Sequence, residues 1–136
     1  MIASRVSRVA AGFVLVTMAV LSACGSSTGP GAPFRPQITN VPDNFQFQAN
    51  NVTRATWTFT YTWSNSGIRA SVDQTSAITA GTATMTILDA GRTQVYANDL
   101  KANGTFITSA GAIGSWTIKI VFTNFFGTPN VRVQKA

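Results

Sequence analysis

The stretch that decides the fold is Thr56-Trp57-Thr58-Phe59-Thr60-Tyr61-Thr62-Trp63, in which threonine and an aromatic residue alternate over eight positions. Successive side chains of an extended strand point to opposite sides of the sheet. The alternation therefore places all the aromatic rings on one face and all the threonines on the other. The stretch predicts a β-strand with one apolar and one polar face.

Other segments with strand-like patterns lie on both sides of this strand. Residues 64–67 and 89–92 form clear turns between them, because Ser, Asn, Asp and Gly favour turn conformations. The strand-like segments are residues 45–48, 68–72, 82–88, 93–96, 105–108, 116–123 and 131–134. No segment has a sustained helical pattern. The sequence therefore predicts an all-β fold: a single antiparallel β-sandwich of about seven or eight strands, immunoglobulin-like or jelly-roll-like.

The charged residues are few and scattered. The 136 residues include ten Lys and Arg, four acidic residues and no His, for a formal net charge of +6. A nucleic-acid-binding protein normally gathers its basic residues on one face or helix. We therefore expect no nucleic-acid partner, and interpret the charge as a diffuse positive surface near anionic lipid or cell-wall polymer.

The N-terminus has the organisation of an export signal. Arg5 and Arg8 precede an apolar run at residues 9–21, which is shorter than the ~20 apolar residues of a membrane-spanning helix. The only cysteine of the chain, Cys24, follows that run. The sequence Leu21-Ser22-Ala23-Cys24 resembles the lipobox of a bacterial lipoprotein signal peptide.

This resemblance implies that residues 1–23 are a signal peptide removed before Cys24. It also implies acylation of the Cys24 thiol, with palmitate among three chains, and thus stable anchoring in a membrane of the cell envelope. An ordinary secretory signal with a coincidental cysteine is the alternative. Gly25 stands where an aspartate retains enteric lipoproteins at the inner membrane, so the resemblance favours the outer membrane if the organism has one. Residues 24–36 are then the lipidated cysteine and a flexible tether, and residues 37–136 the β-sandwich domain.

A second resemblance covers roughly the later half of the chain. An alternating strand and an Asp-x-Gly turn at residues 81–96 are followed by Gly-x-Trp-x-Ile at 114–118 and a closing strand at 131–133. This pattern is similar to bacterial pre-peptidase C-terminal domains and related jelly-roll or immunoglobulin-like modules. Such modules are commonly accessory, so the resemblance implies no catalytic residue. It does not match their acidic metal-binding positions.

The aromatic row of residues 57–63 admits two interpretations. Exposed rings at alternate positions of one strand could stack on sugars, with Trp57, Tyr61 and Trp63 as ligand-binding residues. Alternatively the row is the inner face of the sandwich, since large aromatic residues dominate cores. Trp63, beside the turn at 64–67, is expected to keep partial exposure even then.

The residues needed for catalysis are nearly absent from the chain. Without histidine or glutamate, the four aspartates are the only side-chain carboxylates, and Cys24 is committed to lipid. Asp89 and Asp99 flank one hairpin, but no Asp-x-Asp-x-Asp spacing indicates a calcium loop, so they are interpreted as turn residues. The sequence therefore predicts no enzyme, no metal and no cofactor.

The function expected from these observations is a membrane-anchored, non-catalytic lipoprotein that binds an envelope protein or polysaccharide. An edge strand could bind by adding a strand to the sheet. A carbohydrate-binding module with an exposed aromatic row is the alternative. An enzyme of unrecognised type would require aspartates that converge in a pocket.

Overall fold

The computed structural model describes residues 34–136. The signal peptide expected at residues 1–23, the acylation of Cys24 and most of the expected tether lie outside the described residues. The strands are β1 (Gln37–Val41), β2 (Asn44–Gln48), β3 (Val52–Asn65), β4 (Ala70–Gln74), β5 (Ala77–Leu88), β6 (Gln94–Asp99), β7 (Gly104–Ile107), β8 (Gly114–Thr128) and β9 (Asn130–Lys135).

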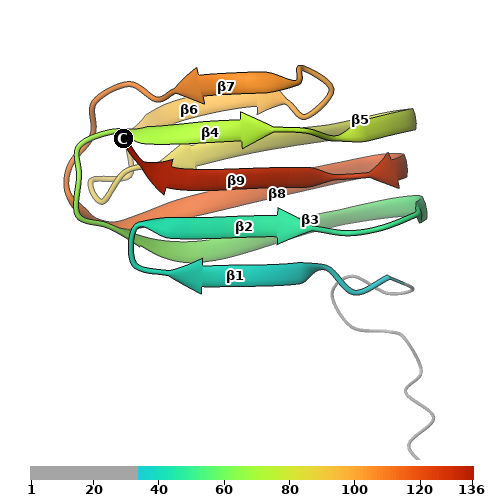
Figure 1. Ribbon diagram of the computed structural model, residues 1–136, viewed down its shortest axis with the longest axis horizontal. Coiled ribbons are helices and arrows are strands. Elements are labelled where there is room, and N and C mark those ends of the chain that lie inside the picture. Colours follow the sequence, from blue (N-terminus) through green and yellow to red (C-terminus); the bar gives the residue numbers. More distant parts are fainter. Residues whose placement is uncertain (1–33) are drawn as a thin grey trace, which may run out of the picture.

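These strands form two antiparallel sheets packed face to face. The five-stranded sheet has the order β1-β2-β9-β4-β7 and lies in front in Figure 1; the four-stranded sheet, β3-β8-β5-β6, lies behind it. The predicted all-β antiparallel sandwich is thus confirmed, and residues 34–136 form nine strands instead of the seven or eight expected. The strand that the sequence pattern missed is β1, whose five residues are all exposed and so show no apolar alternation.

The core is built from alternate residues of both sheets and is rich in aromatic rings. Trp63 of β3 and Trp116 of β8 meet edge to face at 6.0 Å between ring centroids. Phe122 stacks on Phe125 at 4.4 Å, and Phe47 of the opposite sheet meets Phe122 edge to face. Such aromatic pairs contribute about 0.5–1.5 kcal/mol beyond the burial of their surface.

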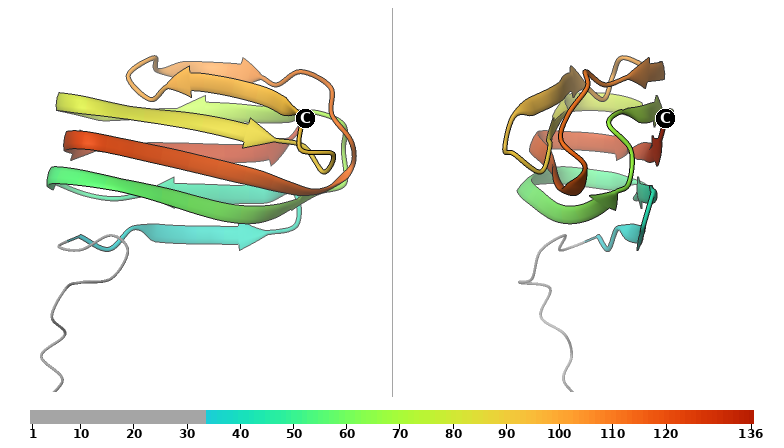
Figure 2. Two further views of the ribbon diagram at one scale, coloured as in Figure 1. Left: turned by 180° about the vertical axis from the view of Figure 1, so that it is seen from behind. Right: turned by 90° about the vertical axis from the view of Figure 1, so that its left-hand side faces the viewer.

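The sandwich has two distinct ends. We call the end where the described chain begins the entry end; it also holds the connections at residues 49–51, 75–76 and 100–103. The opposite end, which we call the loop end, holds the connections at residues 42–43, 66–69, 89–93 and 108–113. The loop end is on the left in Figure 1 and faces the viewer in the right-hand panel of Figure 2.

A row of irregularities crosses the three long strands of the four-stranded sheet. Arg54 of β3, Asn124 of β8 and Gly81 of β5 all have positive φ, at 47°, 43° and 71°. The pairing register shifts on both sides of β8 at this level. Bulges of this kind bend and twist a strand. Only glycine fits at position 81, because a Cβ there would collide with the backbone carbonyl of Asn124.

Candidate functional site

The aromatic row on β3 lies mainly inside the sandwich. Trp63 has no exposed surface, and its indole N–H donates a hydrogen bond to the Val41 carbonyl at 3.2 Å. Phe59 is buried beneath Phe47 and Phe122. Trp63 therefore serves packing and closes the sheet edge against β1, instead of keeping the partial exposure expected for the strand end.

The other two residues predicted to bind a ligand are more accessible. Tyr61 is half-buried against Phe45, at 5.2 Å between ring centroids, and burial raises the pKa of its hydroxyl. Trp57, beside the row of bulges, keeps 42% of its surface exposed. The exposed row of three rings that a stacking site for sugars needs is thus not formed, because Trp63 is buried, Tyr61 is half-buried and only Trp57 is exposed.

Asp89 organises the loop end. Its carboxylate is buried and accepts the backbone N–H of Thr93 and that of Ala112, both at 2.8 Å. These bonds join the β5–β6 turn to the loop at residues 108–113. They favour the charged form, so the backbone donors of Ala112 and Thr93 hold the pKa of Asp89 below its usual value.

Asp43 plays a similar role in the β1–β2 turn. It accepts hydrogen bonds from the backbone N–H and the hydroxyl of Ser66, both at 2.7 Å, and pairs with Lys135 at 3.6 Å. The two Ser66 bonds, aided by Lys135, lower its pKa.

The remaining aspartates are also engaged locally. Asp73 accepts the Thr105 hydroxyl at 2.6 Å, and Asp99 accepts the backbone N–H of Lys101 at 2.8 Å. Within residues 34–136, no three His, Cys, Asp or Glu side chains come together in a way that would hold a metal ion. The structure therefore places each carboxylate in a turn or a cross-strand contact.

A second buried polar group lies at the entry end. Gln74, fully buried, donates to the carbonyls of Asp99 and Ala102 and accepts the Tyr96 hydroxyl at 2.6 Å. All these contacts hold the β6–β7 connection against β4. The sequence did not single out this network, because glutamine and tyrosine at these spacings carry no motif.

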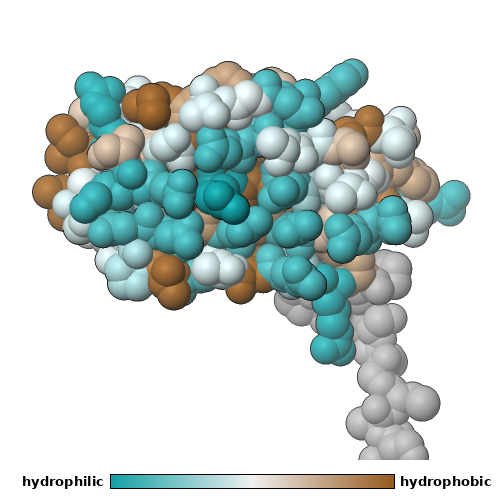
Figure 3. Space-filling model, in the orientation of Figure 1, coloured by the Kyte–Doolittle hydropathy of each residue, from teal (hydrophilic) through white to brown (hydrophobic). Residues whose placement is uncertain are grey.

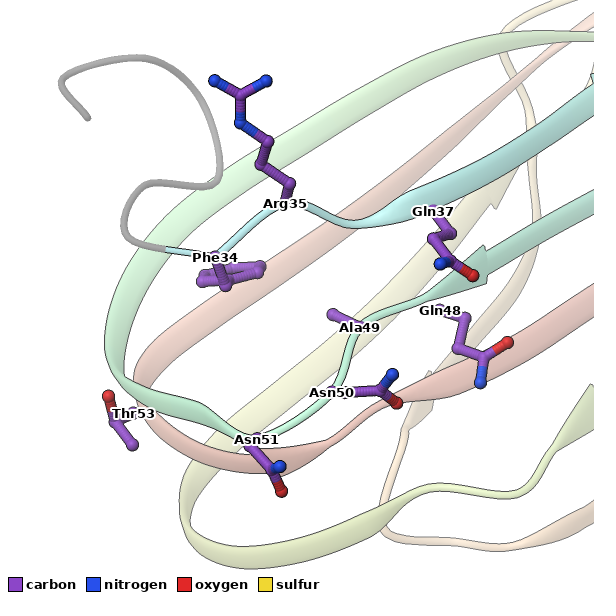
Figure 4. A pocket seen from close by; sticks show the side chains of 8 residues that line it. All are labelled: Phe34, Arg35, Gln37, Gln48, Ala49, Asn50, Asn51 and Thr53. Atoms are coloured by element: carbon purple, nitrogen blue, oxygen red, sulfur yellow. The ribbon is translucent and has the colours of Figure 1, made fainter. Parts of the chain in front are cut away.

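A polar hollow of about 330 Å³ opens at the entry end, beside the start of the described chain (Figure 4). Its lining is rich in side-chain amides, from Gln37, Gln48, Asn50 and Asn51. Phe34 also lines it, while Arg35 points away from the other lining side chains. Amides both donate and accept hydrogen bonds, so this lining matches an uncharged ligand that carries hydroxyl groups.

The loop end presents apolar side chains to the outside. Of the six large apolar residues that are exposed in the described part of the chain, four lie there: Val41, Ile68, Ile107 and Ile113, with 49%, 52%, 57% and 60% of their surface free. Figure 3 shows apolar residues at the left-hand edge of the molecule, where the loop end lies. The alternation in the sequence predicts a strand that begins at Ile68, whereas β4 begins only at Ala70.

Comparisons with known proteins indicate no function, so the functional proposal rests on this geometry. The chain matches no protein-family model and no curated protein sequence. Residues 34–136 include no helix of the length and hydropathy needed to cross a membrane.

Proposed function

We propose that the protein is a membrane-anchored lipoprotein of the cell envelope whose β-sandwich is a non-catalytic binding module. The observation that carries this proposal is that the chain entry and the exposed apolar loops lie at opposite ends of the sandwich. The chain that leads from Cys24 reaches the domain at the entry end, while the longer loops and most exposed apolar residues gather at the loop end. An anchor on Cys24 would hold the loop end away from its own membrane.

The packing of Phe34 supports a fixed relation between the chain entry and the domain. The centroid of its ring lies 6.1 Å from that of Phe59 and 5.9 Å from that of Phe122, so the first described residue is partly buried against the core. The tether expected at residues 24–36 would then be held to the domain from Phe34 onward. A lipid anchor would act on one defined end of a rigid body.

The non-catalytic character is supported by what the carboxylates do. Asp43 and Asp89 accept several hydrogen bonds from neighbouring loops, and these bonds stabilise the fold. A carboxylate that is engaged in this way and has a lowered pKa is a poor general base.

The anchor is tested by intact-mass measurement of the full chain purified from the envelope of a bacterium that processes lipoproteins. We expect a mass that lacks residues 1–23 and carries acyl chains on Cys24, and we expect Cys24→Ala to lose both changes. A mature chain that begins elsewhere and carries no acyl mass would refute the lipoprotein proposal.

Carbohydrate binding is the second candidate, and the polar hollow favours it over the aromatic row. Its amides would donate to and accept from the hydroxyl groups of an envelope polysaccharide, while Phe34 would supply an apolar surface. The site would then lie at the entry end and not on the β3 aromatics that the sequence suggested.

This candidate is tested by affinity electrophoresis in gels that contain isolated envelope polysaccharide. Replacing Gln48 and Asn50 together by Ala should weaken binding about thirtyfold, because two lost hydrogen bonds at about 1 kcal/mol each add up to about 2 kcal/mol. Gln94→Ala, an exposed amide on β6, is the matched control. Equal retardation of all three proteins would exclude the hollow as the site.

A further inference from the structure

The four exposed apolar residues of the loop end are spread around its rim. Val41 ends β1, at one edge of the five-stranded sheet, and Ile107 ends β7, at the opposite edge. Four strand spacings separate these edges, which corresponds to about 19 Å. Ile68 and Ile113 extend from neighbouring loops, which the hydrogen bond from the Gly111 N–H to the Ile68 carbonyl joins at 2.7 Å.

The same end carries exposed positive charge. Arg69 and Arg92 are exposed in the loops at residues 66–69 and 89–93, and Lys135 lies near the end of β9. Of the two aspartates at this end, Asp43 pairs with Lys135, and Asp89 is buried and satisfied by backbone N–H groups. Three basic side chains therefore face two carboxylates at this end, and neither arginine is paired with a carboxylate of the described residues, although Arg69 donates to the Thr108 carbonyl at 3.2 Å. This leaves a small excess of positive charge on the loop end.

We propose that the loop end is a membrane-contacting surface, which inserts Val41, Ile68, Ile107 and Ile113 into the interface of a bilayer that contains anionic lipid. Arg69 and Arg92 would lie at the level of the phosphates. Apolar side chains flanked by basic residues bind bilayers by burial of apolar surface together with attraction to anionic headgroups.

The arrangement of these residues favours a membrane over a protein partner. The binding energy of a protein interface concentrates in a central cluster of contacts, commonly built from Trp, Tyr and Arg. Here the apolar residues are aliphatic and stand apart around a rim. A fluid lipid interface can receive separated aliphatic side chains without a matching pocket.

This inference deepens the proposed function, and it rests on that function only where it concerns a second membrane. With the lipid anchor at the entry end, a membrane contact at the loop end would join two bilayers. The contact itself does not depend on the anchor.

The experiment uses the full chain as its bacterial host processes it, reconstituted in donor vesicles. Protein-free acceptor vesicles of phosphatidylcholine, with or without phosphatidylglycerol, are added, and their recruitment is followed by fluorescence cross-correlation. We expect recruitment only of acceptors that contain phosphatidylglycerol, and its loss at high salt, because salt screens exposed charges.

Variants connect this recruitment to the loop end. Replacing Ile68 and Ile113 together by Ser should reduce recruitment by at least about tenfold, because the loss of two inserted side chains exceeds the 1.4 kcal/mol that corresponds to a factor of ten. Ile38→Ser, at an exposed isoleucine towards the entry end, is the control that should recruit normally. Because these side chains are exposed, the urea unfolding midpoint of each variant should stay that of the wild type.

Three outcomes would overturn the proposal: no recruitment by the wild type, undiminished recruitment by the double variant, or clustering only when both vesicle populations bear protein. The last outcome would indicate contact between two copies of the chain. Flotation of the donor vesicles reports separately on the anchor. If the processed chain is not anchored, it is added in soluble form to the acceptor vesicles, and its flotation then tests the loop end alone.

Discussion

Single residues in unusual environments determine much of this fold, and Asp89 is the clearest case. Its pKa in the folded protein lies below the usual value of about 3.9, because backbone donors stabilise the charged form. The stability that Asp89 contributes is therefore present above about pH 4 and is lost as the pH falls through the folded-state pKa. Asp43, whose pKa is also lowered, acts in the same direction.

We therefore expect the free energy of unfolding to fall below about pH 4, and expect Asp89→Asn to unfold more easily at pH 7 while depending less on pH. Urea unfolding at pH 7, 4 and 3 measures both effects. Asp99→Asn, at an exposed turn, is the matched control. A pH dependence of the Asp89→Asn protein equal to that of the wild type would contradict the assignment.

Gly81 provides a second test of how a single residue determines the fold. Alanine there must adopt a φ near 71° and bring its Cβ against the Asn124 carbonyl, so Gly81→Ala should destabilise the protein by about 1–3 kcal/mol. Gly91→Ala, whose Cβ would meet only ordinary contacts, should change stability by less than about 1 kcal/mol. Thermal and urea unfolding compare the two, and similar losses would argue against a strained bulge at position 81.

The sequence marks Asp89 as a turn residue and Gly81 as a possible bulge, but it does not show that either residue is critical for the fold. The spacing of Asp89 marks it as a turn residue, but its second partner, the Ala112 N–H, lies 23 positions along the chain. A single glycine in a strand pattern indicates a possible bulge, whereas the two further bulged residues, Arg54 and Asn124, become visible only when the three strands pair. The local sequence pattern carries no information on contacts between distant segments of the chain.

At the scale of elements, alternation on β3 predicted the strand and its two faces, and left open which face the sandwich covers. The structure buries Trp63 completely and leaves Trp57 partly exposed. The difference arises from what covers each position: β1 closes over Trp63, while Trp57 lies beside the bulges at an edge of the four-stranded sheet. β1 carries no periodic signal, so the sequence could not predict that cover.

Replacing Trp63 should therefore lower the free energy of unfolding more than replacing Trp57. Trp63→Ala should cost about 3–5 kcal/mol, and Trp57→Ala, which removes a ring that is only partly buried, about 1–2 kcal/mol. If Trp63→Ala does not fold, Trp63→Phe, which keeps a ring but loses the bond to Val41, should show a smaller loss. Urea unfolding measures the costs. Acrylamide quenching should reach Trp57 more readily than Trp63, and equal quenching would contradict the burial described.

The whole molecule is dominated by pairings between distant parts of the chain. β2 pairs with β9 and β3 pairs with β8, so most of the sheet structure requires long loops to close first. Proteins of this kind fold in milliseconds to seconds. Stopped-flow refolding from urea, followed by tryptophan fluorescence, should show a main phase in that range, and a main phase faster than about 100 µs would contradict it.

The fold class was predictable at this scale because alternation, turn residues and the lack of helical periodicity all agree. The candidate sites were not. The polar hollow combines Gln37, Gln48 and Asn50, and the loop end gathers Val41 with Ile107, residues that only the two-layer arrangement brings to one surface. Sequence spacing could not relate them, because the strand order of the sheets is not the order of the chain.

The place of β9 has a consequence for how the chain is made. β9 lies between β2 and β4 and pairs with both, so the front layer has a gap in its middle until residues 130–135 are present. A ribosome synthesises the chain from its N-terminus, so these residues emerge after the other eight strands of residues 34–136. The nascent chain therefore cannot close its sandwich before residues 130–135 have left the ribosome.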